Sequence, residues 1–189
     1  ADVNKFLKKC RKEISFTGLF FFIQLCWVSM IYRIPNCYDS HTHFLATGEI
    51  ASGLQLQVLK AAEEIGSVSI KPSFFRGDWL TGFGWDQNQW KRSEFPNAEM
   101  LDQFFPNTPV FFSRVDGHAS WVNSLAQQQL RKKGMKISSG VLFEQDHIQA
   151  LSLLPEFSEQ QMKGFLNESQ KIFNRAGFTH VRDLSMNLK

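Results

Sequence analysis

Two histidines separated by one residue, His41 and His43, are the side chains whose type and spacing most directly indicate chemistry. In a β-strand, positions i and i+2 point to the same face. Two imidazoles side by side suit one divalent metal ion, since imidazole is the commonest protein ligand for zinc and its relatives. Asp39, two residues earlier, falls on the same face and would orient the site from below. The alternative is that both rings are solvated or hydrogen-bonded in a loop.

Polar residues also follow two other apolar segments. Residues 79–85 are predicted to be a strand that runs into the polar and aromatic stretch DQNQWKRSEF at 86–95. Residues 110–115 are predicted to be a buried strand that ends in Asp116, Gly117 and His118. The carboxyl ends of strands are where α/β proteins place their chemistry. The alternatives are a surface loop anchored by Trp85 and Trp90, and a structural role for His118.

The elements that must position these residues alternate between strands and helices. Hydrophobic periodicity predicts strands over 37–44, 79–85, 110–115 and 178–183, and helices over 48–66, 97–105, 121–133 and 158–176. Asn97 is a predicted N-cap, Ser158 and Gln161 fit a capping box, and Gly177 is expected to end the last helix. Residues 134–147 are predicted to be a loop. This order indicates βαβ units and an α/β fold with a parallel sheet.

Composition narrows the class of protein. The 189 residues are 43% hydrophobic and 21% charged, which is typical of a globular domain. The net charge of +3 is not concentrated on one predicted face, so the sequence does not indicate a nucleic-acid-binding protein. Cys10, Cys26 and Cys37 are odd in number and lack Cys-x-x-Cys spacing. A disulfide framework is therefore not expected, and a reducing, cytoplasmic location is the default prediction.

The first residues suggest an alternative location. Residues 1–13 are basic, and Ile14 to Tyr32 carry no charge. A basic segment before an apolar run of about 20 residues resembles a signal anchor, so residues 14–32 could hold the chain at a membrane. Two other interpretations stay open: a buried helix or pair of core strands, and a segment that was not selected for this fold at all.

Four stretches together resemble amidohydrolase family 3 of the amidohydrolase superfamily, in the branch that includes N-substituted formamide deformylases. These are PNCYDSHTHF at 35–44, GWDQNQW at 84–90, RVDGHASWVNS at 114–124 and GFTHVRD at 177–183. They occur in the family's order and at plausible spacings. Asn36 and Cys37 depart from the usual Gly-Phe, a mild change because Asn tolerates left-handed backbone.

The resemblance implies that residues 35–189 are the first part of a (β/α)8 TIM-type barrel, and that residues 1–34 are an atypical N-terminal segment. It implies a divalent metal, most simply zinc, held by His41 and His43. It places Trp85, Asp86, Arg114 and His118 on the substrate side. The implied activity is hydrolysis of carbon–nitrogen bonds other than peptide bonds, in small amides or N-substituted formamides.

The same resemblance shows which family residues have no match here. The family's later strands supply a carboxylated lysine that bridges the metals, two more histidine ligands and a catalytic aspartate. No catalytic residue can therefore be assigned by position, and the chain is expected to be inactive alone. Three hypotheses remain: part of a metal-dependent amidohydrolase, a non-catalytic interaction protein anchored at a membrane by 14–32, and a metal-binding module completed by self-association through exposed barrel edges.

Overall fold

The computed structural model describes residues 37–184, which lie within the compact unit Ile34–Lys189. The apolar segment 14–32, and with it the predicted membrane anchor, lies outside the described residues. Within 37–184, no helix has both the length and the apolar character that a membrane crossing needs.

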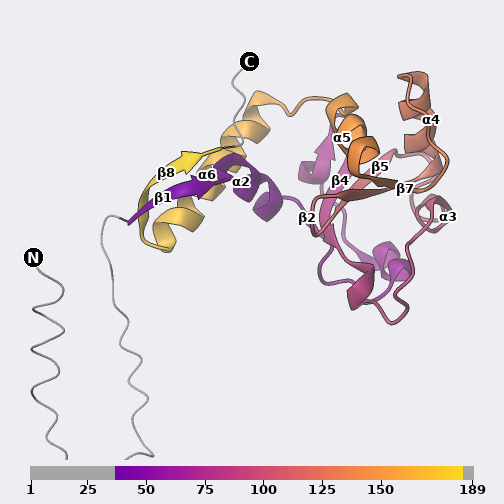
Figure 1. The fold of residues 1–189 in the computed structure, drawn as a ribbon, viewed down its shortest axis with the longest axis horizontal. Coiled ribbons are helices and arrows are strands. Elements are labelled where there is room, and N and C mark those ends of the chain that lie inside the picture. Colours follow the sequence, from indigo (N-terminus) through magenta and orange to yellow (C-terminus); the bar gives the residue numbers. More distant parts are fainter. Residues whose placement is uncertain (1–36, 185–189) are drawn as a thin grey trace, which may run out of the picture. The chain divides into compact units, whose positions relative to one another are not determined.

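One part of this unit is a pair of parallel strands with two helices that pack against each other, the first following one strand and the second preceding the other (Figure 1). Strand β1 (Cys37–Thr42) pairs with β8 (Phe178–Asp183), while α2 (Phe44–Ser52) and α6 (Glu159–Arg175) pack against each other. The helices approach closely at Gly48, where an added Cβ would overlap the carbonyl oxygen of Phe165. The predicted strand at 178–183 is confirmed.

The other part is a six-stranded mixed sheet built from residues 54–143. Its central order is β2 (Leu54–Gln55), β4 (Trp79–Trp85), β5 (Val110–Arg114), β6 (Ala119–Val122) and β7 (Val141–Phe143), and β3 (Phe75–Arg76) pairs with β4. The pairs β2–β4 and β4–β5 are parallel, whereas β3–β4, β5–β6 and β6–β7 are antiparallel. The α/β class is therefore confirmed.

The expectation of one parallel sheet was wrong. Only four residues separate β5 from β6, and the turn contains Gly117 at φ 73°. A turn of this length can only reverse the chain, because a parallel neighbour needs a crossover of a dozen or more residues. The mixed sheet is therefore not all parallel, and the predicted strands are also divided between two sheets, with β1 and β8 in one and β4 and β5 in the other.

Short helices and 3₁₀ turns connect or follow the strands of the mixed sheet. They are the 3₁₀ turns η1 (Ala62–Ser67), η2 (Pro72–Phe74) and η3 (Gln87–Gln89), and the helices α3 (Ala98–Asp102), α4 (Ser124–Lys132) and α5 (Glu144–Leu153). Asn97 caps α3 by accepting a hydrogen bond from the Met100 N–H, as predicted. Ser158 and Gln161 form the predicted capping box of α6, and Gly177 follows it at φ 92°.

The predicted helix over 48–66 was wrong. Helix α2 ends at Ser52, and Gly53 is extended with ψ 179°. Leu54 and Leu56 then enter the core, where Leu56 is fully buried. Two leucines at a spacing of two residues fit the edge of a sheet as well as a helix, and pairing of β2 with β4 decides between them.

The predicted boundaries around residue 121 were also wrong. Trp121 and Val122 are fully buried in β6, and the helix begins only after Asn123. The predicted loop 134–147 contains β7 and the start of α5. Both errors have one cause: pairing between β6 and β7 is a contact between distant residues, which local periodicity does not reveal.

A cluster of three tryptophans lies in the core of the mixed sheet. Trp85, Trp90 and Trp121 have ring centroids 6.0 to 6.3 Å apart. The Trp85 indole donates to the Phe112 carbonyl at 2.8 Å, and the Trp121 indole donates to the Asn97 carbonyl at 2.7 Å. Trp85 and Trp90 therefore anchor the 86–95 loop from inside the core.

Candidate functional site

His41 and His43 lie at the carboxyl end of β1, and both are exposed. Their ring centroids are 5.9 Å apart and the rings are inclined at 79°. His43 has left the strand and precedes α2, at φ −111° and ψ 70°. The Asp39 Oδ1 accepts a hydrogen bond from the backbone N–H of His41 at 3.0 Å.

The neighbouring strand brings a carboxylate to the same end of this sheet. Asp183 is the register partner of Thr42 on β1. Its Oδ2 accepts a hydrogen bond from the Leu45 N–H at 3.1 Å, and so satisfies a backbone donor in the first turn of α2. Asp183 thereby ties β8 to the helix that begins directly after His43. Sequence reasoning placed this residue at a strand end but gave it no partner.

The two histidines fit two positions of a metal site. With metal–nitrogen distances of about 2.0–2.1 Å, two imidazole centroids on one ion lie roughly 5 Å apart. The observed 5.9 Å is wider by only about 1 Å, which rotation of two exposed side chains can close. No group of three or more His, Cys, Asp or Glu side chains suited to a metal occurs within residues 37–184. Among the described residues the His41–His43 pair therefore offers two candidate ligands, fewer than the three of a catalytic zinc site.

Arg114 is the centre of a second polar group, at the carboxyl ends of β4 and β5. Its Nε donates to Gln87 Oε1 at 2.9 Å, and its Nη2 lies 3.3 Å from Asp86 Oδ1. Its Nη1 also pairs with Asp116, and the guanidinium carbon lies 5.9 Å from the centroid of a Trp85 ring. The guanidinium is thus held by two carboxylates, an amide and an aromatic face. Trp85 is fully buried, so this aromatic contact of Arg114 is fixed by the core.

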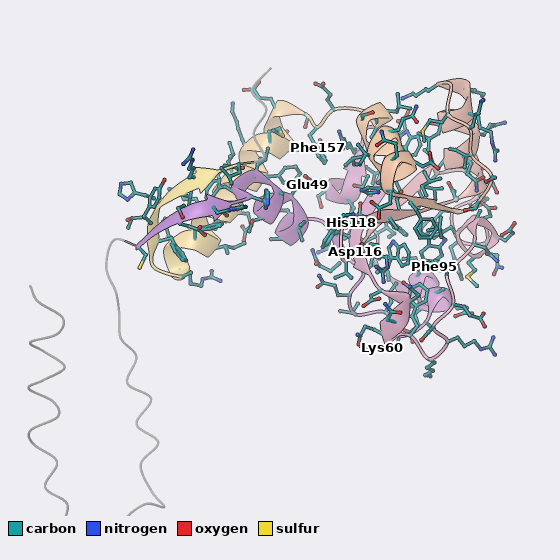
Figure 2. All side chains as sticks on the ribbon, in the orientation of Figure 1. Glu49, Lys60, Phe95, Asp116, His118 and Phe157 are labelled. Atoms are coloured by element: carbon teal, nitrogen blue, oxygen red, sulfur yellow. The ribbon has the colours of Figure 1, made fainter. Side chains whose placement is uncertain are left out.

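His118 follows this group along the chain, at the β5–β6 turn (Figure 2). Its backbone N–H donates to Asp116 Oδ1 at 3.0 Å, and its ring Nδ1 lies 3.1 Å from Glu144 Oε2. Burial alone would raise the pKa of Asp116, but the hydrogen bond from His118 N–H and the charge of Arg114 hold it below the ordinary value. The carboxylate of Asp116 is therefore the stable form near neutral pH.

His147 is a further titratable residue in this region that the sequence did not single out. It is buried, its ring stacks on Phe111 with centroids 5.8 Å apart, and its Nδ1 has no hydrogen-bond partner among the described residues. Burial, together with the neighbouring His118, lowers the pKa of His147. Its position in α5, inside the stretch predicted as loop, explains why it was missed.

The six predicted site residues form two groups on different sheets. His41 and His43 belong to the β1–β8 pair, whereas Trp85, Asp86, Arg114 and His118 belong to the mixed sheet. The structure connects Trp85, Asp86 and Arg114 directly, and it connects His118 to them through Asp116. Ligand binding by these residues stays a prediction.

A sequence profile of the amidohydrolase family matches residues 34–189, which include every described residue. The chain belongs to the amidohydrolase family. The bacterial protein named "Putative amidohydrolase YtcJ", from Bacillus subtilis (strain 168), is 28% identical over a region that covers 80% of this chain and 32% of that protein. Protein LONG AFTER FAR-RED 3 of Arabidopsis thaliana is 34% identical over 49% of this chain and 16% of the plant protein.

Two solved structures share the fold of this amidohydrolase-family chain. An uncharacterized metal-dependent hydrolase from Pyrococcus furiosus is 25% identical, with a TM-score of 0.57 over 78% of this chain and 31% of its own. One from Pyrococcus horikoshii OT3 is 22% identical, with a TM-score of 0.58 over 78% of this chain and 30% of its own, and this likeness concerns the fold alone. The chain thus spans about a third of the length of these hydrolases and of the bacterial relative.

Proposed function

We propose that this chain supplies the first metal ligands and part of the substrate site of a metal-dependent hydrolase. Its substrates are small molecules with carbon–nitrogen bonds other than peptide bonds, such as amides or N-substituted formamides. The observation that carries the proposal is the His41–His43 pair, with ring centroids 5.9 Å apart at the carboxyl end of β1, in a chain of the amidohydrolase family.

The parallel β1–β8 pair supports a barrel interpretation. In a (β/α)8 barrel, neighbouring strands are parallel, helices follow the strands, and functional residues lie at the carboxyl ends. Here α2 follows β1 in the chain and α6 precedes β8. His41 lies at the carboxyl end of β1, and His43 follows that end directly. We therefore assign β1 and β8 to the barrel, with the mixed sheet inserted between α2 and α6.

The proposed roles follow from where each side chain lies. His41 and His43 hold a divalent metal, of which zinc is the simplest choice for imidazole ligands. Such an ion supplies Lewis-acid activation of water and of the substrate carbonyl. Arg114, held by Asp86 and Asp116, offers a fixed positive charge with planar donors that suits a carbonyl or carboxylate oxygen.

Two protein ligands predict weak metal retention and no measurable metal-dependent hydrolysis of amides or formamides by residues 1–189 alone, because an open catalytic zinc site uses three protein ligands. Titration of the purified chain with zinc, followed by elemental analysis after dialysis, tests the site. We expect weak binding that the double variant His41→Ala/His43→Ala abolishes. The matched control is His180→Ala, which removes an exposed histidine from the adjacent strand β8.

Equal zinc binding by the wild-type chain and the double variant would refute the assignment of His41 and His43 as ligands. Loss of binding in His180→Ala would show instead that β8 contributes a ligand. Binding that is tight and stoichiometric in the wild-type chain would contradict the two-ligand interpretation, since two imidazoles do not form a closed site.

A further inference from the structure

His118 and Glu144 form a close pair of side chains although 26 residues separate them. Pairing of β6 with β7 places Ala119 opposite Phe143, so the residues just outside this register pair, His118 and Glu144, also meet. The His118 Nδ1 lies 3.1 Å from Glu144 Oε2. Both side chains are largely exposed, at 68% and 73%, so solvent can reach the ring nitrogen that does not face Glu144, Nε2.

The backbone holds the same two residues a second time. The Glu144 N–H donates to the His118 carbonyl oxygen at 2.8 Å. To do this Glu144 takes φ 43°, a left-handed conformation found in no other non-glycine residue among those the structure describes. Such a conformation is unfavourable for a residue with a side chain and tends to occur at functional sites.

The His118 backbone is fixed from the opposite side as well. Asp116 Oδ1 accepts the His118 N–H at 3.0 Å, and Arg114 pairs with the same Asp116 carboxylate. The charged groups around the imidazole are therefore Asp116, Arg114 and Glu144, and the buried His147 also interacts electrostatically with His118. This arrangement holds the position of the residue that carries the ring.

We propose that His118 and Glu144 form a nucleophilic dyad that reacts with small esters that carry a good leaving group. Glu144 is the positioning residue: its carboxylate accepts the Nδ1–H of His118 and leaves Nε2 as a free base and nucleophile, which is how a carboxylate directs a histidine in hydrolytic sites. This dyad goes beyond the proposed metal site and does not depend on it.

The step can be written for the ester p-nitrophenyl acetate. The Nε2 lone pair forms a bond to the carbonyl carbon, the ester C–O bond breaks, and p-nitrophenolate leaves with the electron pair. The ring becomes an acyl-imidazolium whose Nδ1–H remains hydrogen-bonded to Glu144, so the carboxylate stabilises the positive charge as it forms. Water then attacks the acyl carbon, the Nε2–C bond breaks, acetate leaves, two protons pass to solvent, and neutral His118 returns with its proton on Nδ1.

The test is release of p-nitrophenolate by the 189-residue chain in the presence of EDTA, which removes any contribution from a metal. We expect His118→Ala to lower the protein-dependent rate more than His180→Ala, which removes another exposed histidine. Glu144→Gln should lower the rate by about two- to fivefold, a modest factor because the pair is exposed and screened. Asp146→Asn is the matched control, since it removes an exposed carboxylate from the same turn of α5, and it should leave the rate unchanged.

Nitrogen-15 NMR of the wild-type imidazole gives a readout that needs no variant. The dyad requires the neutral His118 to carry its proton on Nδ1, whereas free histidine carries it mainly on Nε2. A neutral ring with its proton on Nε2 would overturn the proposal. So would an unchanged rate in His118→Ala or in Glu144→Gln, or an equal loss in Glu144→Gln and Asp146→Asn.

Discussion

Truncation of Asn123 should lower the free energy of unfolding strongly, although it removes only a few atoms. Its side chain is fully buried and makes hydrogen bonds with four backbone groups. The amide nitrogen donates to the carbonyls of Phe105 and Thr108 at 2.9 and 2.8 Å. The amide oxygen accepts from the N–H groups of Val110 and Ala126 at 3.1 and 2.9 Å. One amide therefore joins the start of β5, the loop before it and the N-terminus of α4.

The magnitude for Asn123→Ala follows from these bonds. Loss of an N-cap costs about 1 kcal/mol, and a buried donor left without a partner costs about 1–3 kcal/mol. With partial relaxation of the loop, we expect the free energy of unfolding to fall by about 3–5 kcal/mol. Native domains are stable by only about 5–15 kcal/mol, so this variant should be close to unfolding.

Urea denaturation followed by circular dichroism measures this loss. With a slope of about 1–3 kcal/mol per molar urea, the midpoint should fall by at least about 1 M. The control is Asn97→Ala, which removes an exposed N-cap whose side chain accepts a hydrogen bond from the Met100 N–H at 3.1 Å, and it should cost about 1 kcal/mol. Equal midpoints for the two variants would refute the reasoning, because they would show that the four buried bonds add nothing beyond one cap.

Two further predictions concern the stability of the chain at acid pH and the packing of α2 against α6. Burial lowers the pKa of His147 from 6.5. As the pH falls below 6.5, His147 therefore binds a proton more readily in the unfolded chain than in the folded chain. The free energy of unfolding should therefore fall as pH drops below about 6.5, and His147→Phe should flatten that part of a pH series of urea titrations; an unchanged slope would contradict this. Gly48→Ala places a Cβ against the Phe165 carbonyl oxygen and should destabilise the α2–α6 contact by about 1–3 kcal/mol. Thermal unfolding measures this loss, with Gly164→Ala as the control because its Cβ meets open space; equal melting temperatures would refute the argument.

Elements with strong local signals were predicted correctly. The cap at Asn97, the capping box at Ser158 and the glycine after α6 depend on hydrogen bonds or backbone angles within a few residues. The strands at 79–85 and 178–183 were also found, because an apolar run between breakers is a local pattern. In the site, the closeness of His41 and His43 follows from their spacing alone.

Features that depend on pairing between distant segments were missed. The helix predicted over 48–66 gave way to a strand because Leu54 pairs with Gly82, and the loop predicted over 134–147 gave way because Trp121 pairs with Val141. The contact of His118 with Glu144 arises from the same β6–β7 pairing. Burial of His147 likewise depends on how α5 packs against the sheet, which its own sequence does not show.

The sequence by itself determined the α/β class, the family and the two histidines at the end of the first strand, because each of these depends on residue types at short spacing. Only the tertiary structure decided that the strands divide into two sheets, that Asp183 ties β8 to α2, and that Arg114, Asp116, His118 and Glu144 form one connected group. The physical reason is that strand pairing is a long-range hydrogen-bonded contact. Its partners are selected by the packing of the whole core rather than by neighbours in the chain.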